Sequence, residues 1–149
     1  MKKARILFLC TGNSCRSQMA EGWARHLGND IAEVESAGIE AHGMNPRAIA
    51  VMAEAGVDIS GQPSTRVTDE MIRRADIVVT VCGHADEYCP ALPPGVTKTH
   101  WPLSDPAKAR GTEDEIMAVF RATRDLIRGR VTELLSEFRN RRPASASSP

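Results

Sequence analysis

Short apolar runs alternate with amphipathic stretches along most of the chain. The two strongest runs, residues 4–10 and 76–82, consist mainly of apolar side chains, and each ends at a cysteine. Runs of this length and composition are typical of strands that are buried on both faces of a parallel sheet. Two weaker runs, residues 32–36 and 96–101, bring the number of expected strands to four.

Helical periodicity fills the intervals between these strands. One apolar helix face begins after Ser17 and ends at Gly28, where a glycine is a usual stop signal. Pro46 and Thr68 stand where the next two helices should begin, at the first helical position and at the cap respectively. A long amphipathic helix then opens at residues 112–115.

This alternation predicts the fold class. Strands that alternate with helices form a parallel sheet through right-handed crossovers. We therefore expect a single α/β domain over residues 1–139, with a central parallel four-stranded sheet and helices on both of its faces. Residues 140–149 are rich in Pro, Ala and Ser, and are expected to form a disordered tail.

Charge and hydropathy exclude several classes of partner. The 149 residues include 19 Lys and Arg and 19 Asp and Glu, so the formal net charge is zero and gives no general attraction to nucleic acid or to an anionic membrane. No apolar run approaches the roughly 20 residues of a transmembrane helix. The N-terminus lacks the roughly 7–15 apolar residues of a signal peptide. We expect a cytoplasmic protein without a nucleic acid or membrane partner.

Four cysteines, Cys10, Cys15, Cys82 and Cys89, carry the chemical interest of the sequence. In a reducing compartment they are not expected to form a structural disulfide framework. Four residues separate the first pair and six separate the second, unlike the two-residue spacing of a zinc knuckle, so no such metal site is expected. Catalytic or redox-active thiols are the remaining interpretation.

The segment from Cys10 to Ser17 has the form Cys-x5-Arg-Ser and lies between an expected strand and an expected helix. Five intervening residues allow the backbone to curl around a tetrahedral oxyanion, with N–H groups pointing inward and a helix N-terminus behind them. Arg16 offers a planar fork to two anion oxygens. In that field Cys10 should be a thiolate nucleophile, which the Ser17 hydroxyl can hold.

Other residues of this loop suit the same role. Gly12 and Asn13 tolerate the positive φ that such a curled backbone needs. The alternative interpretation is a buried cysteine beside a surface arginine, but the placement between strand and helix favours an oxyanion site. Its expected binding residues are Thr11, Gly12, Asn13, Ser14, Cys15, Arg16 and Ser17.

Cys82 and Cys89 form a second candidate thiol pair. Ligands of open parallel sheets bind beyond the carboxyl ends of the strands, so Cys10 and Cys82, each at such an end, should meet at the site. In a helix, residues 82 and 89 would lie ~10 Å apart, whereas a disulfide needs Cα atoms within ~7 Å. The pair can therefore close only if the segment unwinds, which suits a redox relay. Two unrelated thiols remain the alternative.

Asp105 is the candidate general acid. It follows the last expected strand, and Pro102 and Pro106 stiffen its loop. An acid of this kind would protonate an oxygen that leaves the oxyanion. Spacing alone equally allows an aspartate that only caps the following turn. Cys15 is expected to face the core and is given no catalytic role.

Taken together, these segments resemble the thioredoxin-coupled arsenate reductases, whose fold is that of the low-molecular-weight protein tyrosine phosphatases. The resemblance covers about residues 4–138. It rests on residues 10–22, Ser36-Ala37-Gly38, Cys82, Cys89-Pro90, Pro93-Pro94, His100-Trp101 and Asp105-Pro106.

The resemblance implies a mechanism. Cys10 would attack arsenate, with Arg16 and the loop amides binding the oxyanion and Asp105 assisting the departure of water. Cys82 would then attack Cys10, releasing arsenite, and Cys89 would attack Cys82. The final Cys82–Cys89 disulfide would be reduced by thioredoxin. Like the family, the protein is expected to be a monomer without a tightly bound cofactor.

Potassium is an open point of the resemblance. Some members of the family bind this ion through residues that correspond to Asn13, Glu21 and Ser36, together with an Asp that follows a Ser. Here Ser64 is followed by Thr65, so the acidic ligand is missing, which counts against potassium.

Three other functions remain open from the sequence. A low-molecular-weight tyrosine phosphatase would use Cys10, Arg16 and Asp105 equally well, although hydrolysis needs no thiol relay. A non-catalytic phosphate-binding or thiol-sensing module would show no turnover. A reductase that used a small thiol in place of thioredoxin would not need Cys89.

Overall fold

A four-stranded parallel sheet forms the centre of the protein. The computed structural model describes residues 2–88 and 92–147. Strands β1 (Ala4–Cys10), β2 (Ala32–Gly38), β3 (Ile77–Thr80) and β4 (Thr97–His100) lie in the order β2-β1-β3-β4, and every neighbouring pair is parallel. The expected fold class and its four strands are confirmed.

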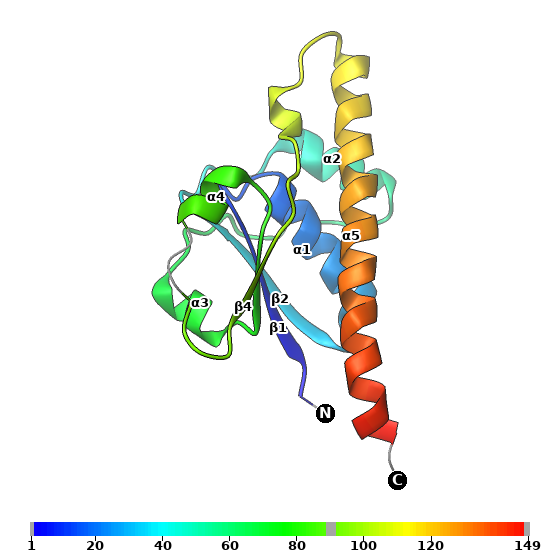
Figure 1. Ribbon diagram of the computed structural model, residues 1–149. Coiled ribbons are helices and arrows are strands. Elements are labelled where there is room, and N and C mark those ends of the chain that lie inside the picture. Colours follow the sequence, from blue (N-terminus) through cyan, green and yellow to red (C-terminus); the bar gives the residue numbers. More distant parts are fainter. Residues whose placement is uncertain (1, 89–91, 148–149) are drawn as a thin grey trace.

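Helices cover both faces of the sheet (Figure 1). On one face, α1 (Arg16–Gly28) packs against β1 and β2, and the long helix α5 (Glu113–Ser147) packs against α1 and α2 (Pro46–Glu54). On the other face lie α3 (Asp69–Arg74) and α4 (Gly83–Tyr88), both in contact with β1. A short 3₁₀ turn, η1 (Pro106–Lys108), links β4 to α5.

The core follows from the apolar pattern of the sequence. Ile6, Leu7, Phe8 and Leu9 of the central strand β1 are buried on both faces of the sheet. Helix starts are fixed by capping side chains. Asn45 accepts hydrogen bonds from the first turn of α2, and Thr68 accepts one from the first turn of α3. Thr112 and Glu115 each accept from the other's backbone N–H, which is the reciprocal arrangement of a capping box.

Two segments go beyond what the sequence indicated. Residues 83–88, which the sequence did not assign to a helix, form helix α4, which is too short for apolar periodicity to reveal. Helix α5 continues to Ser147, into residues 140–149, which we expected to form a disordered tail. The Arg139 side chain donates to both carboxylate oxygens of Asp30 and to the carbonyl of Leu27, which fastens this part of α5 to the end of α1. Residues 148 and 149 of the expected tail lie outside the described residues.

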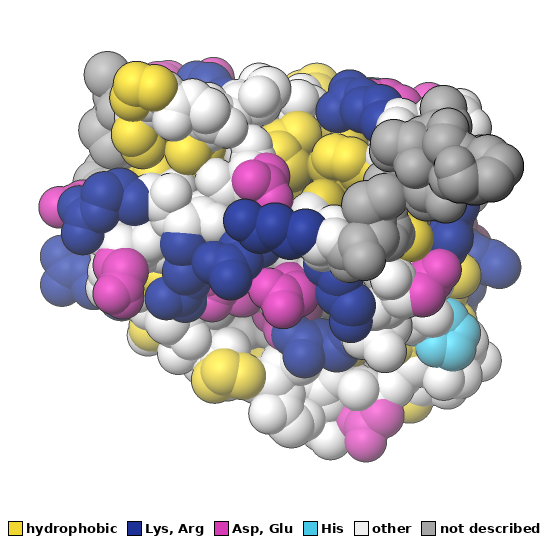
Figure 2. All heavy atoms as spheres, turned by 90° about the horizontal axis from the view of Figure 1, so that it is seen from below, with side chains coloured by type: hydrophobic (Ala, Val, Ile, Leu, Met, Phe, Trp, Pro, Cys, Tyr) yellow, Lys and Arg dark blue, Asp and Glu magenta, His cyan; other side chains and the backbone are white. Residues whose placement is uncertain are grey.

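The surface agrees with the balanced composition. On the face seen in Figure 2, basic and acidic side chains alternate, and neither sign of charge gathers into one area. Among residues 2–88 and 92–147, no helix has both the length and the apolar character needed to cross a membrane.

Candidate active site

The chemically interesting residues gather at the carboxyl edge of the sheet. Cys10 is the last residue of β1, Cys82 follows β3, and Asp105 follows β4. All three line one open cavity of about 770 Å³, as the topology predicts. The same cavity is lined by Thr11, Gly12, Ser14, Cys15 and Arg16 of the expected anion loop.

The backbone of the anion loop is held from outside by residues 39–45, which we call the strap. Strap N–H groups donate to the carbonyls of Cys10, Thr11, Gly12 and Ser14 at 2.9–3.0 Å. The Ser64 hydroxyl donates to the carbonyl of Asn13 at 2.9 Å. In a planar trans peptide the N–H points opposite to the C=O, so the next N–H groups face the inner side of the loop. Fixing five carbonyls outward thereby presents a concave row of amide donors to an anion.

Asn13 fixes the shape of the loop from within. It is fully buried and has φ of 48°, the positive φ that the sequence allowed for it. Its amide nitrogen donates to Ser17 Oγ and to Ser36 Oγ, each at 2.9 Å, and its Oδ1 accepts from Thr65 N at 2.7 Å. All of these polar atoms therefore have partners inside the protein.

Gly12 is required for a different reason. We expected Gly12 to adopt a positive φ, but its φ is not positive. A Cβ at this position would come within 2.9 Å of His42 Cγ and closer still to Nδ1 of the same ring. The ring of His42 thus lies directly against the loop and forms part of the cavity wall.

Cys10 is buried, and its Sγ lies 2.8 Å from Ser17 Oγ. The amide nitrogen of Asn13 can only donate to Ser17 Oγ. The hydroxyl hydrogen of Ser17 is therefore free to point at the sulfur, so Ser17 can donate to a Cys10 thiolate. The sulfur also lies close to the N-terminus of α1, whose partial positive charge favours an anion.

Arg16 and Asp105 lie on the wall of the same cavity as this sulfur. Nη1 of Arg16 donates to the carbonyl of Leu103 at 2.8 Å and to that of Val81 at 3.3 Å, while Nη2 lies 3.7 Å from Asp105 Oδ2. Asp105 Oδ1 accepts from Ala107 N at 3.0 Å and caps η1. Both interpretations of Asp105 are therefore compatible, since one oxygen caps the turn and the other faces the site.

Cys82 lies next to the anion loop. Its Sγ is 3.1 Å from Thr11 Oγ1 and accepts a longer hydrogen bond from Ala85 N, at 3.3 Å, in the first turn of α4. The structure thus brings together the two thiols that stand 72 positions apart in the chain, on the wall of one cavity. Cys89 lies outside the described residues, so its expected role stays a prediction.

Comparison with known proteins places this geometry in a family. The sequence matches the low molecular weight phosphotyrosine protein phosphatase family over residues 5–144. The chain belongs to this family. An arsenate reductase of Halalkalibacterium halodurans is 55% identical over 131 residues, which make up 88% of this chain and 94% of that relative. The resemblance to arsenate reductases found in the sequence is confirmed.

Solved structures give the same result. A structure described as an arsenate reductase in the phosphate binding state superposes with a TM-score of 0.74 at 36% identity, over 91% of this chain and 98% of the other. A thioredoxin-dependent arsenate reductase of Corynebacterium glutamicum superposes with a TM-score of 0.75 at 28% identity. That match spans 92% of this chain and 62% of the longer protein.

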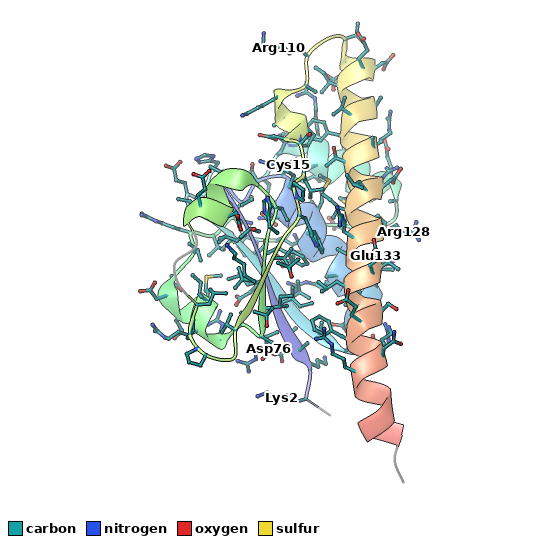
Figure 3. All side chains as sticks on the ribbon, viewed as in Figure 1. Lys2, Cys15, Asp76, Arg110, Arg128 and Glu133 are labelled. Carbon is teal, nitrogen blue, oxygen red and sulfur yellow. The ribbon has the colours of Figure 1, made fainter. Side chains whose placement is uncertain are left out.

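Cys15 differs from the other thiols of this phosphatase-family site. It is buried at the N-terminal end of α1 (Figure 3). Burial, and to a smaller extent the negative charge of Asp105, raise the pKa of its thiol to about 12 against the opposing effect of Arg16. A thiol with this pKa is almost entirely protonated near neutral pH.

The residues that correspond to the potassium ligands of the family already have partners within the described part of the protein. Asn13 Oδ1 accepts from Thr65 N, and Thr65 supplies no carboxylate. Glu21 is buried and accepts from Ser36 Oγ at 2.6 Å and from Arg25. Arg25 therefore already balances this carboxylate, although burial still raises its pKa. Within the described part of the chain, no cluster of three or more His, Cys, Asp or Glu side chains could hold a metal ion.

Sequence reasoning missed the strap and the wall residue His42. The strap acts through backbone N–H groups, which any side chain can accompany, so no residue type marks it. The one signal in the sequence is Gly38. A Cβ there would lie 2.7 Å from Asn13 N and 2.8 Å from Thr11 O, so only glycine allows strap and loop to approach.

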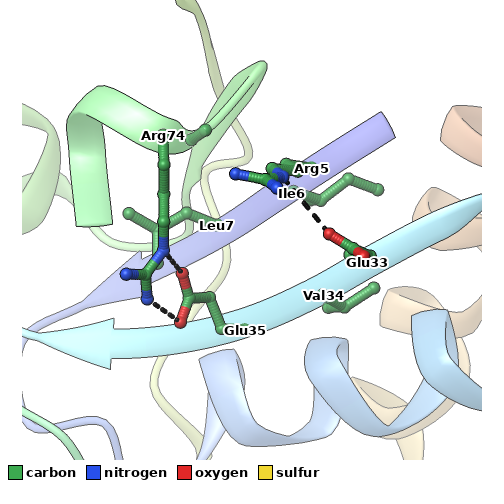
Figure 4. A pocket seen from close by; sticks show the side chains of 8 residues that line it. Arg5, Ile6, Leu7, Glu33, Val34, Glu35 and Arg74 are labelled. Carbon is green, nitrogen blue, oxygen red and sulfur yellow. Dashed lines mark hydrogen bonds and ion pairs between the residues drawn. The ribbon is translucent and has the colours of Figure 1, made fainter. Parts of the chain in front are cut away.

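A second hollow of about 270 Å³ lies over β1 and β2, beside α3. Figure 4 shows that its polar side chains pair with one another: Arg74 donates to both oxygens of Glu35, and Arg5 lies 3.2 Å from Glu33. No cysteine is among the residues that line it, and both of its carboxylates are paired with arginine. The hollow therefore offers no alternative to the cavity around Cys10.

Proposed function

We propose that the protein is an enzyme that reduces arsenate to arsenite and is regenerated by thioredoxin. The observation that carries this proposal is the placement of a second buried thiol, Cys82, on the wall of the oxyanion cavity that holds Cys10. A phosphatase needs the first thiol alone. The relatives named arsenate reductase, at 55% identity, support the same function.

The first step forms a bond between sulfur and arsenic. The Cys10 thiolate, held by Ser17, attacks arsenate in the anion loop, while the amide row and Arg16 balance the negative charge of its oxygens. One oxygen leaves as water, and Asp105 assists this departure from its position beside Arg16. The product is arsenic(V) bound to Cys10.

The second step transfers two electrons to arsenic. The Cys82 thiolate attacks the Cys10 sulfur, the S–As bond breaks, and its electron pair stays on arsenic, which leaves as arsenite. Thr11 and Ala85 N hold the attacking sulfur near the loop. Cys89 then attacks Cys82, which frees Cys10 and leaves a Cys82–Cys89 disulfide for the dithiol of thioredoxin to reduce.

The proposal is tested by arsenate-dependent NADPH oxidation in the presence of thioredoxin and thioredoxin reductase. We expect turnover in the wild type, none in Cys10→Ser or Cys82→Ser, and no multiple turnover in Cys89→Ser. Full multiple turnover in Cys89→Ser would show that the relay is wrong and would favour a small thiol as the reductant.

A phosphatase is the second candidate, because the family match and the set of Cys10, Arg16 and Asp105 also suit phosphate ester hydrolysis. Its test is aryl phosphate turnover measured beside arsenate reduction. Robust hydrolysis without arsenate reduction would favour the phosphatase. No turnover of either substrate would favour a phosphate-binding or thiol-sensing module.

The setting of the reaction follows from the same chemistry. Cys10 and Cys82 must be free thiols before substrate arrives, and both are free in the structure. We therefore place the protein in the reducing cytoplasm. We also propose a monomer without a tightly bound cofactor or potassium, since one chain supplies all the described site residues. Gel filtration and activity in sodium and potassium buffers test these points.

A further inference from the structure

Asp86 links helix α4 to two strands of the sheet. Asp86 Oδ1 lies 2.8 Å from Lys98 Nζ, accepts from Thr80 Oγ1 at 3.1 Å and lies 4.0 Å from His100 Nδ1. Thr80 comes from β3, and the other two residues come from the edge strand β4. We call Asp86, Thr80, Lys98 and His100 the Asp86 anchor.

The anchor has a definite direction of hydrogen bonding. The Thr80 hydroxyl has one hydrogen and donates it to Asp86, so the bond of 2.8 Å to His100 must come from Nδ1–H of the ring. Thr80 is fully buried, whereas Asp86 is half-buried. The hydrogen bond from Lys98 is the largest of the effects that lower the pKa of Asp86, so the carboxylate is charged at neutral pH.

Asp86 lies in the segment of residues 82–89, which must change shape in the relay. Asp86 N donates to the carbonyl of Cys82 at 3.1 Å within α4. In helical geometry, residues 82 and 89 are ~10 Å apart, beyond the ~7 Å that a disulfide allows. Asp86 lies between them, so pairing Cys82 with Cys89 must distort the turn that positions its carboxylate.

We propose that Asp86 is a positioning residue of the relay, which holds the Cys82 segment in its helical dithiol form against Thr80 and Lys98. This inference rests on the proposed function. When the Cys89 thiolate attacks Cys82 of the Cys10–Cys82 disulfide, a new S–S bond forms, Cys10 leaves as thiolate, and the anchor opens. Because closing the anchor again favours the dithiol, the anchor makes the final disulfide easier for thioredoxin to reduce.

The experiment measures the Cys82–Cys89 equilibrium without arsenate. Full-length protein with Cys10→Ser is equilibrated with oxidised and reduced dithiothreitol, which exchange two electrons and two protons with the thiol pair. Mass spectrometry quantifies the disulfide and dithiol peptides. We expect Asp86→Ala to raise the disulfide-to-dithiol ratio about tenfold at a given dithiothreitol ratio.

Two further variants separate anchoring from general stability. Lys98→Met should also raise the disulfide-to-dithiol ratio. It should add little when combined with Asp86→Ala, because both substitutions open the same cluster. Asp125→Asn, which removes a charge paired with Arg124 on α5, is the matched control and should leave the ratio unchanged. Circular dichroism confirms that each variant is folded.

The outcomes distinguish this inference from the proposed function. An unchanged or lower ratio in folded Asp86→Ala overturns the anchor, while arsenate turnover of the wild type stands. A lower melting temperature without a shift of the ratio also overturns it, because it shows a structural role alone. If the parent pair forms no disulfide under any dithiothreitol ratio, the relay and the anchor both fail.

Discussion

One added methyl group at Gly38 should impair oxyanion binding although no residue of the anion loop is itself substituted. In Gly38→Ala the new Cβ would lie 2.7 Å from Asn13 N and 2.8 Å from Thr11 O, and closer still to Glu40 O. All three are backbone atoms, two of them in the anion loop and one in the strap. They cannot rotate away, so the loop and the strap must separate.

The size of the effect follows from this geometry. Overpacking a closed site costs about 1–3 kcal/mol, and in a domain of this size 1 kcal/mol lowers the melting temperature by roughly 2–4 °C. Relief of the clash moves the loop amides by several tenths of an ångström or more. Displacements near 1 Å at a reacting centre cost about 100-fold in rate. We expect kcat/KM for arsenate to fall by about that factor.

Two other glycines provide matched controls for the same chemical change. Gly129 in α5 has no atom within 4 Å of an added Cβ, so Gly129→Ala should keep full activity and raise stability by about 0.5–1 kcal/mol. In Gly12→Ala the obstacle is the side chain of His42, which can rotate, so an intermediate loss is expected.

The assays are arsenate-dependent NADPH oxidation and thermal unfolding with and without phosphate. Phosphate should raise the melting temperature of the wild type and of Gly129→Ala but hardly that of Gly38→Ala. The stabilisation that a ligand gives depends on its affinity for the folded protein, which Gly38→Ala should weaken. Near-normal kcat/KM in a folded Gly38→Ala would refute the argument that the strap shapes the anion site.

Three further predictions concern single side chains. Brief iodoacetamide treatment at pH 8 should alkylate Cys10 and spare Cys15, since a pKa of about 12 leaves roughly one thiol in ten thousand ionised; rapid labelling of Cys15 in the folded protein, read by peptide mass spectrometry, would contradict its burial. Asp105→Asn should lower kcat for arsenate by about 10²–10⁴-fold while phosphate binding, measured by calorimetry, persists; an unchanged kcat would limit Asp105 to capping η1. Burial raises the pKa of Glu21, so the folded state binds its proton more tightly than the unfolded state. The stability of the protein should therefore fall as the pH rises from the pKa of Glu21 in the unfolded chain through its pKa in the folded protein. In Glu21→Gln, urea unfolding should show a smaller fall of stability over this pH range, and an unaltered pH profile would count against this reasoning.

Much of the fold could be predicted because parallel strands leave a strong signal. The run at residues 76–82 is apolar enough to identify a buried strand, although the strand itself covers Ile77–Thr80. Helix α4 has only six residues, too few for a 3.6-residue period to appear. The extension of α5 depends on Arg139 meeting Asp30, a contact between residues 109 positions apart that no local pattern contains.

The candidate site divides in the same way. The Cys10 loop was recognisable because its chemistry needs particular side chains at fixed spacing. The meeting of Cys10 and Cys82 on one cavity wall followed from topology, since both lie at the carboxyl ends of neighbouring strands. The strap could not be predicted, because its contribution consists of backbone hydrogen bonds. The role of Asp86 had no signal in the sequence, because the partners of its side chain come from two strands, β3 and β4.

The adjacency of β1 and β3 has an evolutionary consequence. A Cys-x5-Arg loop after one strand is enough to bind an oxyanion and to attack it, and the end of the neighbouring strand opens on the same cavity. A cysteine gained there, as at Cys82, places a reducing thiol beside an existing nucleophile without any change of fold. An ancestral hydrolase could thus acquire redox chemistry by substitutions in one short segment, while the machinery that recognises the anion stayed as it was.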